Sequence, residues 1–160
     1  MGQLLKRLLL LSIGFISFIG TNAWADNFIC TLHFMKNNCW KAHQITLQPM
    51  DVATQKKIGD PIVLPKGQDE IEVNIPCTPN QDISFSATFS PPIWSDSNMS
   101  YPTSHFWQSP AALPPGATNW IISLCFANDF TSVPLPLEAT ANCQCDFPQG
   151  QNIQVLQPSV

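Results

Sequence analysis

Six cysteines constrain this 160-residue chain more than any other feature. An even number of cysteines in an exported chain predicts three disulfides, which persist in an oxidising compartment. Zinc sites favour C-x2-C pairs or fixed Cys/His sets, but the one close pair here is Cys143-Gln144-Cys145, with no histidine nearby in the sequence. We therefore predict disulfides and no metal centre. The six residues are Cys30, Cys39, Cys77, Cys125, Cys143 and Cys145.

The C-x-C pair restricts how these cysteines are joined. A bridge between Cys143 and Cys145 would close a loop too tight for good disulfide geometry. Each is therefore expected to bond a different partner and to hold the C-terminal segment against the domain. The sequence leaves the remaining choice of partners open.

The first 25 residues have the three parts of a secretory signal peptide. Lys6 and Arg7 form a positive n-region, residues 8–19 are mostly apolar, and Ala23-Trp24-Ala25 has the small-x-small pattern of a cleavage site. The apolar run is shorter than the roughly 20 residues of a membrane-spanning helix. We predict cleavage before Asp26, a periplasmic or secreted location, and no membrane attachment after cleavage.

The remaining chain, residues 26–160, has the length of a single domain. It keeps five lysines, no arginine and eleven carboxylates, which gives it a net charge of −6. Phosphate recognition relies on arginine and on a basic electrostatic field. The composition therefore argues against nucleic acid as a partner, and it does not indicate an oligomeric state.

Alternation of apolar and polar residues predicts β-strands along most of this domain. The clearest run is residues 83–90, in which Ile83, Phe85, Ala87 and Phe89 share one face and Ser or Thr occupies the other. Fifteen prolines leave little room for helices. The predicted fold class is an all-β, disulfide-stabilised sandwich of immunoglobulin-like or transthyretin-like type, with little helix. Further strands are expected at 28–34, 45–47, 70–75, 120–126 and 153–156.

Residues 90–117 depart from this strand rhythm. The segment is rich in Pro, Ser and Asn, yet it carries Trp94, Tyr101, Phe106 and Trp107. Loops longer than about 15 residues are usually functional or disordered. Exposed Trp and Tyr residues make good anchors for a partner. We predict that these four aromatic residues contact an unknown protein or glycan. The alternative is that their rings fold back and plug the open end of the sandwich.

Catalytic motifs are not evident. There is no G-x-S-x-G elbow, and His33 and His105 lie in no recognisable catalytic pattern. We predict no catalytic residue. Glu70 and Glu72 point the same way from one strand, and such neighbours are typical of a solvated edge that discourages aggregation.

A copper site is one metal-binding alternative that the sequence offers. His33, Met35, His43, Met50 and Met99 are soft ligands of the kind copper accepts. A site of that kind also needs a free cysteine close to a His and a Met, and neither Cys125 nor Cys143 has such neighbours. We predict no metal and no cofactor.

Several segments are similar to a group of small, uncharacterised, exported bacterial cysteine-containing proteins. The resemblance spans most of residues 26–160 and implies a periplasmic or secreted location without a transferable enzymatic role. The segments are Asn38-Cys39-Trp40, Phe89-Ser90-Pro91-Pro92-Ile93-Trp94, Leu124-Cys125-Phe126, Val133-Pro134-Leu135-Pro136 and Asn142-Cys143-Gln144-Cys145-Asp146.

The function predicted from these features is a non-enzymatic binding or interaction module of the periplasm or extracellular space. It would contact its partner through the aromatic segment. The alternatives are a small secreted hydrolase, a copper- or zinc-binding protein, and a structural subunit of an envelope assembly.

Overall fold

The computed structural model describes residues 27–93, 99–137, 139 and 143–147. The predicted signal peptide and the strand predicted at 153–156 lie outside these residues. Within the described residues, eight strands and one 3-10 turn make up the regular structure. They are β1 (Phe28–Lys36), η1 (Asn38–Trp40), β2 (Gln44–Asp51), β3 (Ile62–Leu64), β4 (Glu70–Cys77), β5 (Asp82–Ser90), β6 (Tyr101–Pro102), β7 (Trp107–Gln108) and β8 (Asn119–Phe126).

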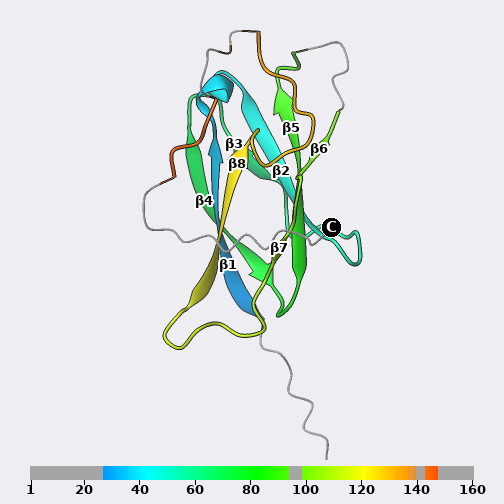
Figure 1. Ribbon diagram of the computed structural model, residues 1–160, viewed down its shortest axis with the longest axis vertical. Coiled ribbons are helices and arrows are strands. Elements are labelled where there is room, and N and C mark those ends of the chain that lie inside the picture. The colour runs from blue at the N-terminus through cyan, green and yellow to red at the C-terminus, as the bar shows by residue number, and fades with distance from the viewer. Residues whose placement is uncertain (1–26, 94–98, 138, 140–142, 148–160) are drawn as a thin grey trace, which may run out of the picture.

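The strands form two sheets (Figure 1). Sheet A has the order β4-β1-β8, in which β1 runs antiparallel to β4 and parallel to β8. Sheet B has the order β3-β2-β5, and β6 and β7 both pair with the outer edge of β5. The chain passes from sheet A to sheet B between β1 and β2, through η1.

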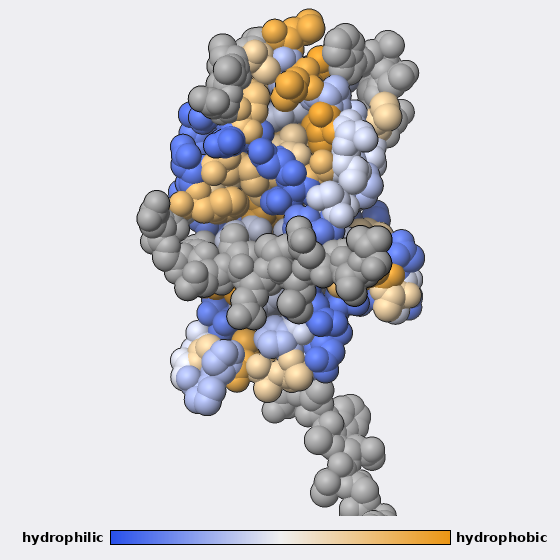
Figure 2. Space-filling model, viewed as in Figure 1, coloured by the Kyte–Doolittle hydropathy of each residue, from blue (hydrophilic) through white to orange (hydrophobic). Residues whose placement is uncertain are grey.

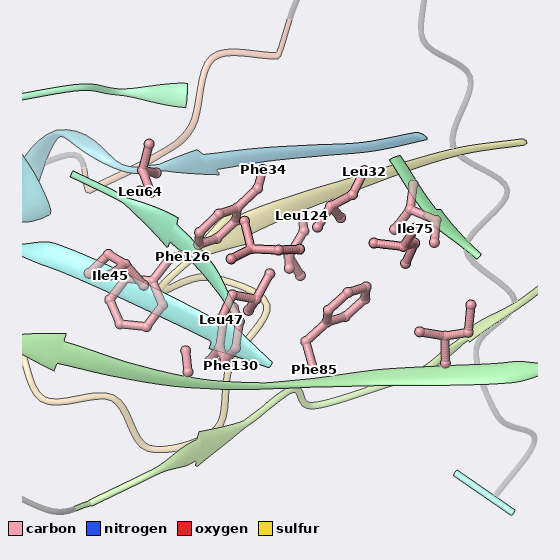
Figure 3. Packing of buried hydrophobic residues seen from close by; sticks show 14 of the residues in the cluster. Leu32, Phe34, Ile45, Leu47, Leu64, Ile75, Phe85, Leu124, Phe126 and Phe130 are labelled. Atoms are coloured by element: carbon pink, nitrogen blue, oxygen red, sulfur yellow. The ribbon is translucent and has the colours of Figure 1, made fainter. Parts of the chain in front are cut away.

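The core lies between the two sheets, where the inward side chains of both meet (Figure 3). Leu32 and Phe34 of β1 face Leu47 and Phe85 of sheet B, and all four are almost completely buried. The alternation seen in the sequence produces this layer, because successive strand residues point to opposite faces. The prediction of a mostly β, two-sheet domain is therefore confirmed. The immunoglobulin-like or transthyretin-like type remains a prediction.

Most strand positions expected from alternation are confirmed. The runs at 28–34, 45–47, 70–75, 83–90 and 120–126 all fall within strands. Three strands were missed, namely β3, β6 and β7, which are only two or three residues long. Within the described residues, no helix is both long and apolar enough to cross a membrane.

The segment expected to be an irregular loop is partly a broken edge strand. Tyr101 pairs with Ala87 and Trp107 pairs with Ile83, both antiparallel to β5. Between these pairs, the amide of Thr103 donates to the carbonyl of Phe85 at 2.9 Å. Residues 101–102 and 107–108 are therefore strand within the segment predicted as a long loop, because pairing with β5 satisfies backbone groups there.

All six cysteines form disulfides, as predicted. The bonds are Cys30–Cys77, Cys39–Cys143 and Cys125–Cys145. Cys143 and Cys145 reach different partners, as the short C-x-C spacing required. Three disulfides in one domain indicate an oxidising, extracytoplasmic compartment.

A buried lysine links two connections to the C-terminal end of β1. The Lys36 ammonium group donates to the carbonyls of His43 and Pro65, each at 2.7 Å. Burial lowers the pKa of Lys36, and the nearby charge of Asp69 partly opposes this shift. The lysine therefore fixes the connection before β2 and the turn after β3 against sheet A.

We expect the two disulfides of the C-terminal segment to differ in how much they stabilise the fold. Cys39–Cys143 spans 104 residues and Cys125–Cys145 spans 20. The loop-closure entropy of the unfolded chain predicts a loss of about 4–5 kcal/mol on removing the first bond and about 3 kcal/mol on removing the second. The free energy of unfolding in urea, measured for the C39A/C143A and C125A/C145A double variants, tests this order. A larger loss for C125A/C145A would contradict it.

Candidate functional site

The structure buries two of the four aromatic residues predicted to contact a partner. Tyr101 is 6% exposed and Trp107 is 3% exposed. The Tyr101 ring stacks on Phe89 with centroids 5.6 Å apart, and the Trp107 ring meets Phe85 edge-on at 5.3 Å. The alternative interpretation, in which rings fold back onto the sandwich, thus describes these two residues. They cover the side of the core beside β5 rather than one open end.

The other two predicted contact residues differ from this pair. Phe106 is half-buried, and Trp94 lies outside the described residues. A contact role for the segment therefore stays a prediction that depends on Phe106 and Trp94. Tyr101 and Trp107 reach a partner only if the segment moves away from β5.

Ser104, His105 and Asp129 come together beside this segment, which bears on the hydrolase alternative. The Ser104 hydroxyl lies 3.1 Å from His105 Nδ1 and donates to the Asp129 carbonyl at 3.1 Å. Since its proton is directed at that carbonyl, the hydroxyl accepts from Nδ1–H. A histidine that donates to a serine does not act as its general base. The group thus ties the segment before β7 to the turn after β8.

The Asp129 carboxylate is itself structural. Its Oδ2 accepts from the Cys125 amide at 2.6 Å. Burial raises the pKa of Asp129, while the Cys125 hydrogen bond and the nearby His105 pull it back down. The carboxylate therefore holds the end of β8 in a turn at an electrostatic cost.

The candidate copper ligands are placed in different surroundings. His33 is on the outer face of sheet A, where its Nε2 lies 3.0 Å from a Glu70 carboxylate oxygen. His43 packs against the rings of Trp40 and Phe89. Across the described residues, no three His, Cys, Asp or Glu side chains form a group suited to a metal ion.

A concave site among the described residues is a groove between β3 and β4. These two strands lie side by side at the same side of the sandwich, one in each sheet, without pairing. The groove has a volume of about 370 Å³, within the usual range of ligand pockets. Its walls are mainly apolar, and Asp60 is the one charged residue that the described part of the chain contributes to them. The lining residues are Gly59, Asp60, Pro61, Ile62, Val63, Ile71, Val73, Asn74, Ile75 and Pro76.

β4 forms one wall of this groove and is also an edge strand. It pairs with β1 on one side and with no other strand among the described residues on the other. An edge strand presents backbone N–H and C=O groups that can pair with another chain. Ile71 and Val73 are only half-buried and border the groove. A chain bound at this edge could therefore form backbone hydrogen bonds with β4 and place apolar side chains in the groove beside it.

The opposite face of β4 is acidic. Glu70 and Glu72 alternate with the groove-lining residues and project onto the outer face of sheet A. Glu70 is 56% exposed and contacts His33. Glu72 is exposed and has no hydrogen-bond or ion-pair partner among the described residues. The edge therefore has an apolar side and a negatively charged side.

A second exposed apolar feature follows β8. Leu135 and Leu137 are 59% and 81% exposed. Figure 2 shows hydrophobic, orange residues at the top of the molecule, where the segment after β8 lies in Figure 1. The β3–β4 groove combines an apolar hollow with a strand edge that has no second neighbour among the described residues, so it is the stronger candidate.

The groove was missed in the sequence, although part of its signal was present. Alternation at 70–75 correctly predicted a strand with Ile71, Val73 and Ile75 on one face. The run Ile62-Val63-Leu64 between Pro61 and Pro65 is a short strand signal. The sequence pattern did not indicate that these two strands would be neighbouring edges.

Comparison with known proteins gives no match among protein families, curated proteins or solved structures. The resemblance to small exported bacterial proteins therefore stays a prediction.

We expect replacement of Trp107 by alanine to destabilise the fold far more than replacement of its neighbour Phe106. Truncating a buried tryptophan costs about 3–5 kcal/mol, whereas a half-buried phenylalanine loses about 1 kcal/mol. Chemical denaturation of W107A and F106A measures both losses. Equal and small losses would show that the Trp107 ring does not pack on Phe85 in solution.

Asp129→Asn gives a test of the buried carboxylate through its pH dependence. The pKa of Asp129 in the folded protein lies above its ordinary value of 3.8. The wild-type protein therefore loses stability as the pH rises from 3.8 through this raised pKa. Asparagine keeps an oxygen acceptor for the Cys125 amide and does not titrate. The free energy of unfolding of D129N minus that of wild type should therefore be larger at pH 7 than at pH 3.5, which means that D129N gains stability relative to wild type as the pH rises. A relative stability that falls as the pH rises would contradict this assignment.

Proposed function

We propose that this chain is an exported, non-enzymatic interaction module that binds an extended segment of a partner protein along the β3–β4 groove. The observation that carries the proposal is the apolar groove beside an edge strand that has no second neighbour among the described residues. Addition of a peptide strand to a sheet edge takes its affinity from backbone hydrogen bonds and its specificity from alternate side-chain pockets. The groove supplies such a pocket.

A protein segment suits this site better than a glycan. Sugar recognition by aromatic residues needs exposed ring faces, and Tyr101 and Trp107 have none to offer. The described residues that line the groove include no aromatic side chain. Aliphatic side chains beside a free strand edge favour another strand. The predicted aromatic contact at Phe106 and Trp94 stays as a second candidate surface.

The proposed location is the periplasm or the extracellular space. The three disulfides support a compartment in which thiols are oxidised. The predicted signal peptide would deliver the chain there. Mass spectrometry of the protein recovered from a periplasmic extract and from the medium would place it and locate the cleavage site.

We expect Val73→Asp to abolish binding of a strand-forming peptide. The probe is an acetylated, amidated peptide of nine residues that alternates valine and threonine. An aspartate in the groove would be buried without a partner against the bound strand, which costs several kcal/mol. Isothermal titration of the disulfide-bonded mature protein should show at least about a tenfold loss of affinity.

Ile121→Asp is the matched control for this variant. Ile121 is 44% exposed and lies on β8, at the opposite edge of the same sheet. Its replacement should leave peptide affinity unchanged, and thermal melts should show both variants folded. In the wild-type protein, amide NMR shifts on titration should fall on residues 62–64 and 70–75. Shifts around Phe106 instead would contradict the groove and favour the aromatic segment.

A further inference from the structure

We infer that the segment bound by β4 alternates apolar residues with lysine or arginine, an inference that rests on the proposed function. This inference is based on the different residues on the two faces of β4. Ile71, Val73 and Ile75 border the groove, whereas Glu70 and Glu72 lie on the outer face. A strand added to β4 follows the same two-residue period. Its alternate side chains therefore enter the groove and lie beside the two glutamates.

The charges around the edge select a basic segment. Glu72 has no ion-pair partner among the described residues, and Asp60 is the one charged residue in the groove wall. None of the described residues that line the groove is a lysine. Opposite charges on neighbouring strands attract, and like charges directly opposite one another are destabilising. A lysine or arginine beside Glu72 would give this carboxylate the partner that it lacks within the described part of the chain.

The same charges disfavour a second copy of this chain as the occupant. Antiparallel pairing of two β4 strands with their grooves on one side would place both copies of Glu70 and Glu72 on one face of the joined sheet. Each copy would also bring a net charge of −6. Pro76 lacks an amide hydrogen and removes one donor near the end of the edge. The occupant is therefore a different chain, which pairs mainly along Glu70–Ile75.

Three peptides of equal length separate this inference from the proposed function. Each is an acetylated, amidated nonapeptide with valine at alternate positions, and lysine, threonine or glutamate occupies the positions between. Titration calorimetry of the mature, disulfide-bonded protein at low salt should give the tightest binding for the lysine peptide. We expect about a fivefold advantage over the threonine peptide and a larger one over the glutamate peptide. Added salt should reduce this advantage.

Two variants with the same change in net charge test whether Glu72 causes the preference for the lysine peptide. Glu72→Gln should remove most of the preference for lysine while leaving affinity for the threonine peptide unchanged. Thr88→Lys, an exposed position on β5 of the other sheet, should leave the preference intact. An equal loss in both variants would mean that overall charge is responsible and would overturn the assignment to β4.

The remaining outcomes are distinct. Equal affinity of wild-type protein for the three peptides, lost in V73D, would overturn the basic-partner inference and leave the groove as a binding site. Failure of all three peptides to bind folded protein would overturn both the inference and the proposed function. Self-association of the protein at neutral pH, blocked by V73D, would show that the occupant is a second copy.

Discussion

Burial of Trp40 between the two sheets holds the sandwich together at the point where the chain crosses over. Its ring lies 4.7 Å from that of Phe89 in sheet B and 4.8 Å from that of Phe126 in sheet A, measured between centroids. The residue is completely buried. The preceding residue, Cys39, is bonded to Cys143. The aromatic contacts and the crosslink thus fix η1, both sheets and the C-terminal segment relative to one another.

One side of the sandwich is covered by additional residues, whereas the other side has strand edges without a further neighbour among the described residues. The proposed function rests on this difference. On the β5 side, Tyr101 and Trp107 cover the core, and Thr103 pairs with Phe130 from the segment that follows β8. Aromatic rings and backbone pairing close that side. On the other side, the outer edges of β3 and β4 pair with no strand among the described residues, and Val63 and Val73 are left partly exposed along the groove. A strand added to β4 would pair with its edge and cover the core there, as residues 101–108 do at the edge of β5.

The candidate site was less predictable than the fold. Aromatic residues in a proline-rich segment suggested an exposed contact surface, but large rings gain more from contact with Phe85 and Phe89 than from water. Their burial depended on pairing with β5, which is distant in sequence from Trp107. Short strands such as β3 have too few residues to show a period. The groove forms because β3 and β4 become neighbouring edges of different sheets. This arrangement depends on contacts between residues far apart in the sequence, so no local sequence pattern predicts it.

The sequence by itself determined which residues form the long strands, which side chains of each strand face inward, and that Cys143 and Cys145 bond different partners. These properties follow from local geometry, because side chains alternate along a strand and short loops strain a disulfide. The tertiary structure decided that β1 lies between β4 and β8, which cysteines are joined, and which strand edges remain open. Alternation identifies the buried face of a strand but not its neighbours. Those are chosen by packing between residues far apart in the chain.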